Sequence, residues 1–404
     1  MVAPIYLIIL FILYIFMSRK ISNTDIFAPW SITISVWTLI ILLFLLYGDT
    51  LNPLTGKFYY SVFLWVTSFS ISSLMIYKLP YVEQNSYKIQ NSKLLCPFSY
   101  SKIGFKVALI LSFIFTPIYF KVIVEALQGD YFALFQRLRE NSNAGFDMGI
   151  TSYVKELNSV ILIAMLWKYP KINKWIFSYV LIVNILGGIA IMEKGSIFYV
   201  LISYLFIFYK KGYITSKKIG LYGGLFLVGA FLMNTMRANH FGEGDFMRFF
   251  SLYVLSSSVA FETLSSGNAP YWGANTFPFF YIFDNIINGT NIDIVQKLKP
   301  FVYVPIPTNV YTVMQPYYED FGYTGVFVFG IINGIIMGYI YRKMTLGNPI
   351  YCCLYTYIVQ ILILQFFQEN FFISLSVFIQ TAFWSYLIFG LKKYSFKISS
   401  YVYK

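Results

Sequence analysis

The sequence predicts an all-α polytopic membrane protein with about eleven (range roughly 10–13) transmembrane helices and a large outer loop that contains short re-entrant or interfacial helices. Of its 404 residues, 58% are hydrophobic and only 12% are charged, whereas a soluble domain carries about twice that charge. Apolar stretches of about 20 residues, long enough to cross a hydrocarbon core, recur along the whole chain. No stretch is long and polar enough to be a separate soluble domain, so residues 1–404 are interpreted as one integrated transmembrane domain.

The transmembrane helices are predicted from the apolar stretches, with boundaries good to about 3 residues. They cover 3–17, 27–47, 58–77, 103–126, 154–168, 175–192, 195–209, 219–236, 321–341, 350–368 and 371–391. The first is interpreted as a retained helix, because no basic segment precedes it and no small-residue cleavage site follows it. Two further apolar pieces, 249–264 and 277–287, are the predicted re-entrant or interfacial helices.

Lysine and arginine predict how the chain is oriented, because short cytoplasmic loops retain basic residues. They cluster in every second loop and in the tail: Arg19, Lys20, Lys78, Lys88, Lys93, Lys102, Lys168, Lys171, Lys174, Lys210, Lys211, Lys217, Lys218, Arg342, Lys343, Lys392, Lys393, Lys397 and Lys404. The N-terminus is therefore predicted on the outer, non-cytoplasmic side of the membrane and the C-terminus on the cytoplasmic side. Two long segments then lie on the outer, periplasmic side: a loop over 127–153 and a larger loop over 237–320.

The predicted span 321–341 carries glycines at four-residue spacing, Gly330, Gly334 and Gly338. Residues four apart lie on the same face of a helix, and glycine lets two helix backbones approach closely. The spacing therefore predicts a face that packs tightly against another helix.

Arginine is concentrated in the two outer loops. The chain has six arginines, and four of them are predicted outside: Arg137, Arg139, Arg237 and Arg248. The guanidinium fork matches phosphate oxygens, so these four residues are candidates for binding a phosphate or diphosphate, together with Lys194 in the tight hairpin before span 195–209. The alternative is local pairing, of the arginines with Glu140, Asp147, Glu243 or Asp245 and of Lys194 with Glu193.

Three outer residues are candidate general bases. His240 and Glu243 belong to the polar cluster 237–245, and Asp320 lies at the outer mouth of span 321–341. A lone histidine is also commonly structural or solvated. Asn309, Tyr311 and Tyr318 are candidate sugar-binding residues, because aromatic faces and amide donors suit sugar rings; aromatic residues also gather at membrane interfaces for lipid reasons alone.

Several classes of protein lack support in the sequence. The chain has no Gly-rich phosphate loop, HExxH, GxSxG or zinc-ligand spacing, so neither a cofactor nor a metal is predicted. Its three cysteines offer no disulfide framework. The net charge of +13 is attributed to cytoplasmic lysines and not to a nucleic-acid partner.

One stretch resembles a known family. It runs from Pro307 to Thr312, continues through Tyr318–Gly325 and enters the glycine-rich helix at Gly330. With Arg237 after span 219–236 and the Lys194-Gly195-Ser196 hairpin, it resembles the bacterial oligosaccharide repeat-unit polymerases, the O-antigen polymerase (Wzy) group. This chain has Lys194 where many members have arginine.

The resemblance implies a metal-independent, inverting membrane glycosyltransferase of lipopolysaccharide and polysaccharide biosynthesis. One polyprenyl-diphosphate-linked (undecaprenyl diphosphate) oligosaccharide is moved onto the non-reducing end of another at the periplasmic face, and the diphosphate leaves. The implied partners are that lipid-linked oligosaccharide, the lipid bilayer, a chain-length regulator and a flippase. Two alternatives stay open: an O-antigen ligase, which uses a lipid A–core acceptor, and a transporter or flippase, against which the nearly uncharged span centres count.

Overall fold

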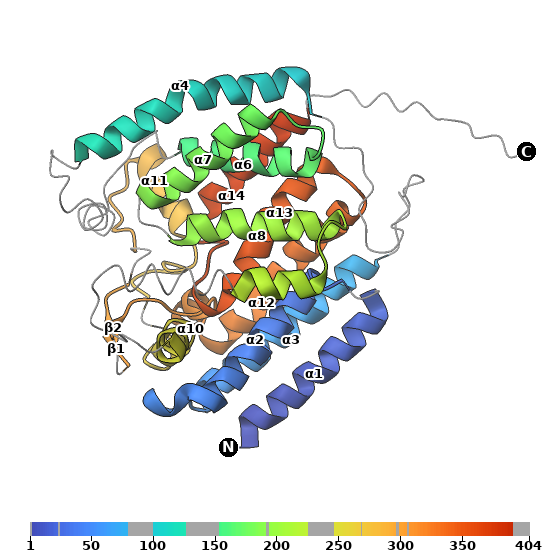
Figure 1. The fold of residues 1–404 in the computed structure, drawn as a ribbon. Helices are drawn as coiled ribbons and strands as arrows, with labels where there is room; N and C mark the ends of the chain where they lie inside the picture. The colour runs from blue at the N-terminus through green and yellow to red at the C-terminus, as the bar shows by residue number, and fades with distance from the viewer. Residues whose placement is uncertain are drawn as a thin grey trace, which may run out of the picture. The chain divides into compact units, whose positions relative to one another are not determined.

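The computed structural model describes residues 2–22, 25–79, 100–126, 153–190, 194–224, 246–267, 269–295, 299–304 and 307–390. These residues are mainly helical (Figure 1). The helices are α1 (Val2–Ser22), α2 (Pro29–Tyr47), η1 (Gly48–Thr50), α3 (Gly56–Lys78), α4 (Lys102–Ala126), α6 (Tyr153–Lys168), α7 (Lys174–Ala190), α8 (Lys194–Lys210), α10 (Phe246–Glu262), α11 (Pro278–Asn288), α12 (Gln315–Thr345), α13 (Pro349–Ile363), η3 (Leu364–Phe366) and α14 (Leu375–Phe389).

The prediction of an all-α polytopic membrane protein is confirmed. Among the described residues, five helical segments are long and apolar enough to cross a membrane: α2, α3, 102–125 of α4, α12, and α13 with η3. Four shorter apolar helical segments accompany them, at 3–16, 174–190, 197–210 and 375–389. Ten of the predicted spans coincide with helices, and the predicted span 219–236 is described only as far as residue 224, where it is helical. The total of about eleven spans stays a prediction.

The chain divides into two compact units. The first comprises Met1–Cys96 and Lys194–Phe378, and the second comprises Pro97–Glu193 and Ile379–Lys404. The single integrated domain predicted from the sequence stays a prediction.

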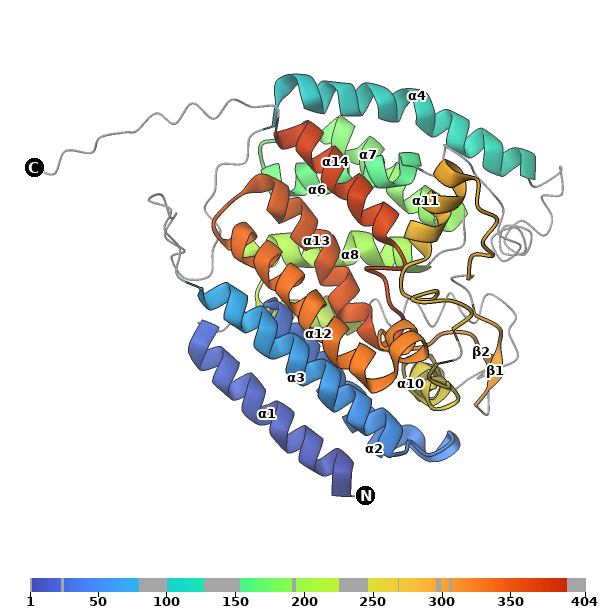
Figure 2. The same ribbon diagram turned by 180° about the vertical axis from the view of Figure 1, so that it is seen from behind.

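The core of the first unit is the packing of α12 against α3, which lie side by side in Figure 2. A Cβ added to Gly330 would come within 2.0 Å of the Ser68 Oγ, and one added to Gly338 within 2.7 Å of the Ser73 carbonyl oxygen. The glycine stripe thus faces a row of serines on α3 at backbone contact distance. The predicted close-packing face is confirmed.

α12 consists of two helical pieces joined at Gly322. This glycine has φ 62° and ψ −149°, a conformation that side chains disfavour. The segment before the kink, 315–321, carries polar residues, whereas the segment after it carries the glycine stripe. The predicted span begins at 321 although the helix begins at Gln315. Hydropathy marks only the apolar piece after the kink, because the piece before it is polar.

A buried glutamine, Gln365, ties connecting segments of the first unit to its helices. The Gln365 Oε1 accepts hydrogen bonds from the indole nitrogens of Trp37 (3.2 Å) and Trp65 (2.9 Å), and its Nε2 donates to the Thr33 Oγ1 (2.8 Å). Its backbone carbonyl accepts from the Val313 N–H at 2.8 Å. Gln365 thereby holds the chain before α12 beside the turn after α13.

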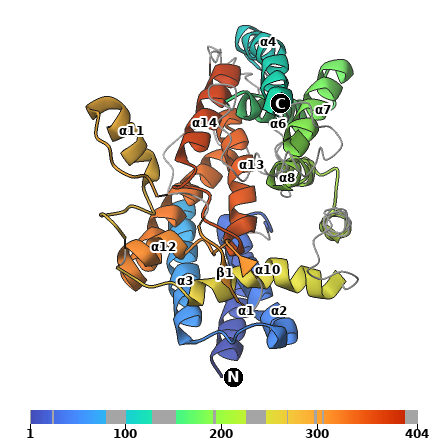
Figure 3. The same cartoon turned by 90° about the vertical axis from the view of Figure 1, so that its left-hand side faces the viewer.

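The two predicted pieces of the large loop are helices as expected, α10 with 17 residues and α11 with 11. Figure 3 shows α10 running crosswise to α3, with α11 standing apart from α12 and α13. Phe280, Phe283 and Ile286 on α11 are exposed. The re-entrant or interfacial placement of α10 and α11 stays a prediction. The antiparallel pair of short strands β1 (Val302–Tyr303) and β2 (Pro307–Thr308) was not expected from the sequence.

The second unit is held by a buried polar cluster between α4, α6 and α7. The Ser112 Oγ donates to the Asn158 Oδ1 at 2.5 Å, and the Asn158 Nδ2 donates to the Thr116 Oγ1 at 3.1 Å. The Ser159 Oγ donates to the Asn184 Oδ1 at 3.0 Å. Side-chain hydrogen bonds between helices are a common means of association where apolar surface gives no preference.

Candidate functional site

A polar pocket lies in the first unit where three connecting segments meet the start of α12. Its cavity volume is about 10 Å³, room for about one water molecule or one hydroxyl group. Its lining is rich in amides and ionisable groups: Lys299, Asn309, Val310, Tyr311, Gln315, Gln368, Glu369 and Ile373. Among the described residues this arrangement gathers one carboxylate, one ammonium, three carboxamides and one phenol. Such a set can both donate hydrogen bonds to a hydroxyl group and accept one from it.

Glu369 is the buried carboxylate of this pocket, with 1% of its surface exposed. Its Oε1 accepts hydrogen bonds from the Phe371 N–H (2.7 Å), the Phe372 N–H (3.0 Å) and the Tyr317 hydroxyl (3.1 Å). Its Oε2 accepts from the Ile373 N–H at 2.8 Å. Burial raises the pKa of the Glu369 carboxyl above its ordinary value, and these four donors oppose the rise because they favour the charged form.

Behind Glu369, Tyr317 is fully buried and held in place by its neighbours. Its ring stacks on Phe329 (centroids 4.6 Å apart) and on Trp65 (5.6 Å). The Asn333 Nδ2 donates to the Tyr317 hydroxyl at 3.2 Å. The hydroxyl that supports Glu369 is therefore fixed by packing as well as by hydrogen bonding.

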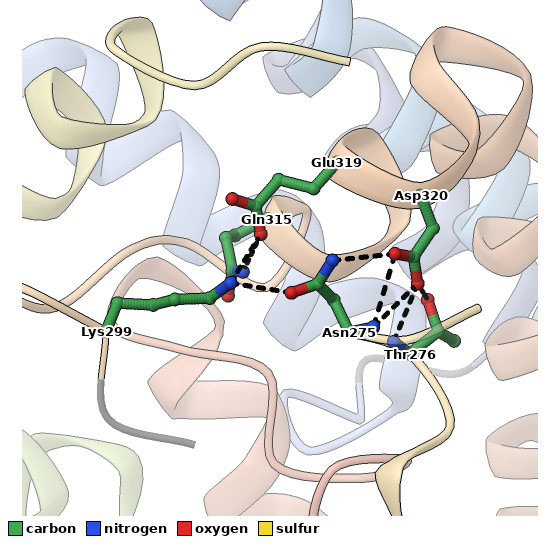
Figure 4. A network of polar contacts seen from close by, with 6 residues as sticks. All are labelled: Asn275, Thr276, Lys299, Gln315, Glu319 and Asp320. Atoms are coloured by element: carbon green, nitrogen blue, oxygen red, sulfur yellow. Dashed lines mark hydrogen bonds and ion pairs between the residues drawn. The ribbon is translucent and has the colours of Figure 1, made fainter. Parts of the chain in front are cut away.

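Two lining residues, Lys299 and Gln315, belong to a polar network around Glu319 (Figure 4). The Lys299 Nζ donates to the Asn275 Oδ1 at 2.6 Å and lies 3.1 Å from the Glu319 Oε2. The Gln315 Nε2 donates to the same Glu319 oxygen. The negative charge of Glu319 thus orients both a cation and an amide of the lining.

Tyr311, which also lines the pocket, keeps its proton. Burial, and then the nearby charge of Glu319, raise the pKa of the Tyr311 hydroxyl above its ordinary value. The phenol therefore stays a hydrogen-bond donor at neutral pH.

Asp320, one of the predicted bases, does not line the pocket and has both oxygens occupied. They accept hydrogen bonds from the backbone N–H groups of Asn275 and Thr276, from the Asn275 Nδ2 (2.7 Å) and from the Thr276 Oγ1 (2.7 Å). These bonds anchor the chain just before α11, as Figure 4 shows. Its role as a base stays a prediction.

The three predicted sugar-binding residues separate into two places. Asn309 and Tyr311 line the pocket together. Tyr318 is buried elsewhere, with its ring 5.2 Å from that of Phe261 and the Lys57 Nζ 4.9 Å from its centroid. Their binding of sugar stays a prediction.

Most of the predicted phosphate-binding residues and candidate general bases lie outside the described part of the chain. These are Arg137, Arg139, Arg237, His240 and Glu243. Arg248 belongs to α10 and Lys194 begins α8, but the structure does not describe their side chains. Within the described residues, no group of three or more His, Cys, Asp or Glu could hold a metal ion.

Sequence reasoning missed Glu369, Lys299 and Gln315 as members of one site. A signal was present for Glu369, which lies in the polar Gln368-Glu369-Asn370 step between two apolar spans. A carboxylate so close to the membrane needs a partner or a function. Lys299 and Gln315 carry no local signal, because only the folded loops bring them together.

The comparisons with known proteins agree with the resemblance found in the sequence. No family profile matches the chain, and no solved structure does. An O-antigen polymerase from Shigella dysenteriae is 26% identical over 202 residues, which are 46% of this chain and 49% of that protein. The chain thus spans about half the length of the curated relative it matches. This multi-pass membrane protein is similar to an O-antigen polymerase, as its sequence predicted.

Proposed function

We propose that this protein polymerises oligosaccharide repeat units carried on a polyprenyl diphosphate, by glycosyl transfer at the periplasmic face of the bacterial inner membrane. The similarity to an O-antigen polymerase over about half of each chain carries the proposal. The relative's name supports polymerisation of O-antigen in general. The donor lipid, the inverting course and independence from metal come from the wider family resemblance and belong to the proposal.

The reaction needs two kinds of site, one for the leaving diphosphate and one for the acceptor sugar. Negative charge develops on the diphosphate as its bond to the sugar breaks, and guanidinium groups already in place stabilise that charge. Arg137, Arg139, Arg237 and Arg248, with Lys194, are the proposed diphosphate-binding residues.

We assign the attacking hydroxyl group of the acceptor sugar to the polar pocket, which has room for about one such group. Sugar hydroxyls both donate and accept hydrogen bonds, and the pocket offers carboxamides of both polarities at Asn309, Gln315 and Gln368, with a phenol at Tyr311. The sequence offers His240, Glu243 and Asp320 as bases for the acceptor hydroxyl.

The proposal is tested with the purified protein in lipid nanodiscs. Lipid-linked repeat units are added without nucleotide and with a chelator of divalent ions, and the products are resolved by size and mass. We expect dimers, trimers and longer lipid-linked chains with release of one polyprenyl diphosphate per bond. Transfer of single units only to an added lipid A–core acceptor would contradict polymerisation and identify a ligase. A product that requires nucleotide or metal would contradict the mechanism.

A further inference from the structure

The pocket contains a buried carboxylate that the sequence did not single out as a base. Removing a carboxylate from water is costly unless hydrogen bonds compensate it. Glu369 is 1% exposed, lies outside the spanning segments between η3 and α14, and lines a polar cavity. Its position in the lining places the carboxylate beside a small polar cavity with room for about one hydroxyl group.

The two oxygens of Glu369 differ in their remaining capacity. Each carboxylate oxygen has two lone-pair sites, so a carboxylate accepts about four hydrogen bonds. Among the described residues, the Oε1 accepts three hydrogen bonds, and the Oε2 accepts one, from the Ile373 N–H. The Oε2 can therefore accept a further donor. Asp320, by contrast, accepts at least two hydrogen bonds on each oxygen and lies outside the pocket lining.

We infer that Glu369 is the catalytic base, whose Oε2 accepts the proton of the attacking acceptor hydroxyl in the polar pocket. This inference rests on the proposed polymerase function and deepens it. The hydroxyl proton passes to Glu369 while the acceptor oxygen bonds to the anomeric carbon of the donor glycan. The bond from that carbon to the diphosphate oxygen breaks, and its electron pair leaves with the diphosphate. Glu369 then returns its proton to water.

The surroundings of Glu369 suit this role. Burial raises its pKa, which makes the carboxylate a stronger base, while the backbone N–H donors keep the charged form accessible. The titratable groups around it are Tyr317 from α12 and, in the pocket wall, Tyr311 and Lys299, the last paired with Glu319. Tyr317 acts as a positioning residue through its hydroxyl.

The first experiment compares Glu369→Gln with Glu125→Gln in the nanodisc polymerisation assay. Glu125 is an exposed carboxylate on α4, paired with Lys121 at 3.5 Å, and provides a matched loss of charge away from the pocket. Glutamine keeps the oxygen that Tyr317, Phe371 and Phe372 bind but cannot accept a proton at neutral pH. We expect kcat to fall by about 10²–10⁴-fold with KM near that of the wild type. The melting temperature should fall modestly, because the amide nitrogen cannot accept the hydrogen bond from the Ile373 N–H. Glu125→Gln should polymerise normally.

A pH profile separates a base from a residue that only holds the loop. Wild-type activity should decline as the pH falls through the raised pKa of Glu369, since the carboxylate must be ionised to take the proton. Tyr317→Phe removes a donor that favours the ionised form, so the acid limb should move to higher pH. If Glu369→Gln fails to accumulate, the pH profiles of the wild type and Tyr317→Phe still test whether Glu369 acts as the base.

The outcomes are distinguishable. If the wild type forms polymer and Glu369→Gln polymerises as well as Glu125→Gln, the inference is wrong and the proposed function stands. An acid limb unmoved in Tyr317→Phe also overturns the inference. If the wild type forms no polymer from intact lipid-linked units, the proposed function itself fails.

Discussion

Glu369 and Asp320 are both carboxylates held by backbone N–H groups, yet the folded chain gives them different surroundings. Both Asp320 oxygens accept hydrogen bonds from Asn275 and Thr276, which fixes the chain just before α11. Glu369 keeps one oxygen with spare capacity in a polar pocket. Both side chains end in a carboxylate and share the same predicted sidedness, so the distinction depends on the groups that fold around each one.

Arg237 provides the test of the diphosphate proposal at the scale of a single residue. Arg237→Ala should reduce polymer formation by about 10²–10³-fold at normal protein level, because one stabilising group for the leaving charge is lost. Arg237→Lys should recover only part of the activity, since lysine keeps the charge but not the bidentate fork. Polymer length and yield are measured on gels of cell-surface polysaccharide.

Arg19→Ala is the control for this substitution, because Arg19 is predicted on the cytoplasmic side, away from the diphosphate. Wild-type chain lengths in Arg237→Ala would rule out its proposed role. Equal loss in both variants would indicate a general effect of removing arginine.

At the scale of elements, the contact of α12 with α3 positions the pocket. The segment 315–321 carries Gln315 to the pocket, and its Tyr317 and Glu319 hydrogen-bond the lining residues Glu369 and Gln315. The glycine stripe beyond the Gly322 kink anchors that segment to α3. Each glycine faces a different kind of obstacle on α3. At Gly330 the nearest atom is a serine hydroxyl, whereas at Gly338 it is backbone.

Alanine at these two glycines should therefore have unequal effects. Both substitutions gain about the same helix propensity, so that gain cancels in the comparison. Gly338→Ala must separate two backbones and should destabilise by about 1–3 kcal/mol, whereas Gly330→Ala needs only a shift of Ser68 and should cost less. Melting temperatures in detergent measure the difference.

A second substitution sharpens this prediction. Ser68→Ala removes the Oγ that lies 2.0 Å from the added Cβ and should restore much of the stability lost in Gly330→Ala. Should Gly338→Ala prove as stable as the wild type, the helices would not be packed at backbone contact.

At the scale of the whole molecule, the sidedness of the loops decides whether the pocket faces the lipid-linked substrate. Trp272, in the large loop, is predicted outside, and Trp175, in the first turn of α7 next to the lysine-rich loop, is predicted at the cytoplasmic side. Both side chains are exposed, at 72% and 87%, so they form a matched pair.

Single-cysteine variants test this orientation in a background without Cys96, Cys352 and Cys353. A membrane-impermeant maleimide should label Trp272→Cys in intact spheroplasts and should label Trp175→Cys only after the membrane is broken. The reverse pattern would place the pocket in the cytoplasm and contradict glycosyl transfer at the periplasmic face.

The sequence by itself determined the features that depend on local composition. Apolar length marked the helices, including the short α10 and α11, and four-residue glycine spacing marked the face that packs on α3. The stretch from Pro307 to Gly334 indicated the resemblance to O-antigen polymerases, which a relative at 26% identity supports. These signals are readable because each depends on residues near one another in the chain.

Only the tertiary structure decided which polar residues share a site. Lys299, Gln315 and Glu369 come from segments far apart in sequence, and they meet because Gln365 joins the chain before α12 to the turn after α13. The same folding buries Tyr318 away from the pocket and surrounds the Asp320 oxygens with hydrogen-bond donors. Spare hydrogen-bonding capacity depends on which backbone N–H groups fold around a carboxylate, and residue spacing does not encode that geometry.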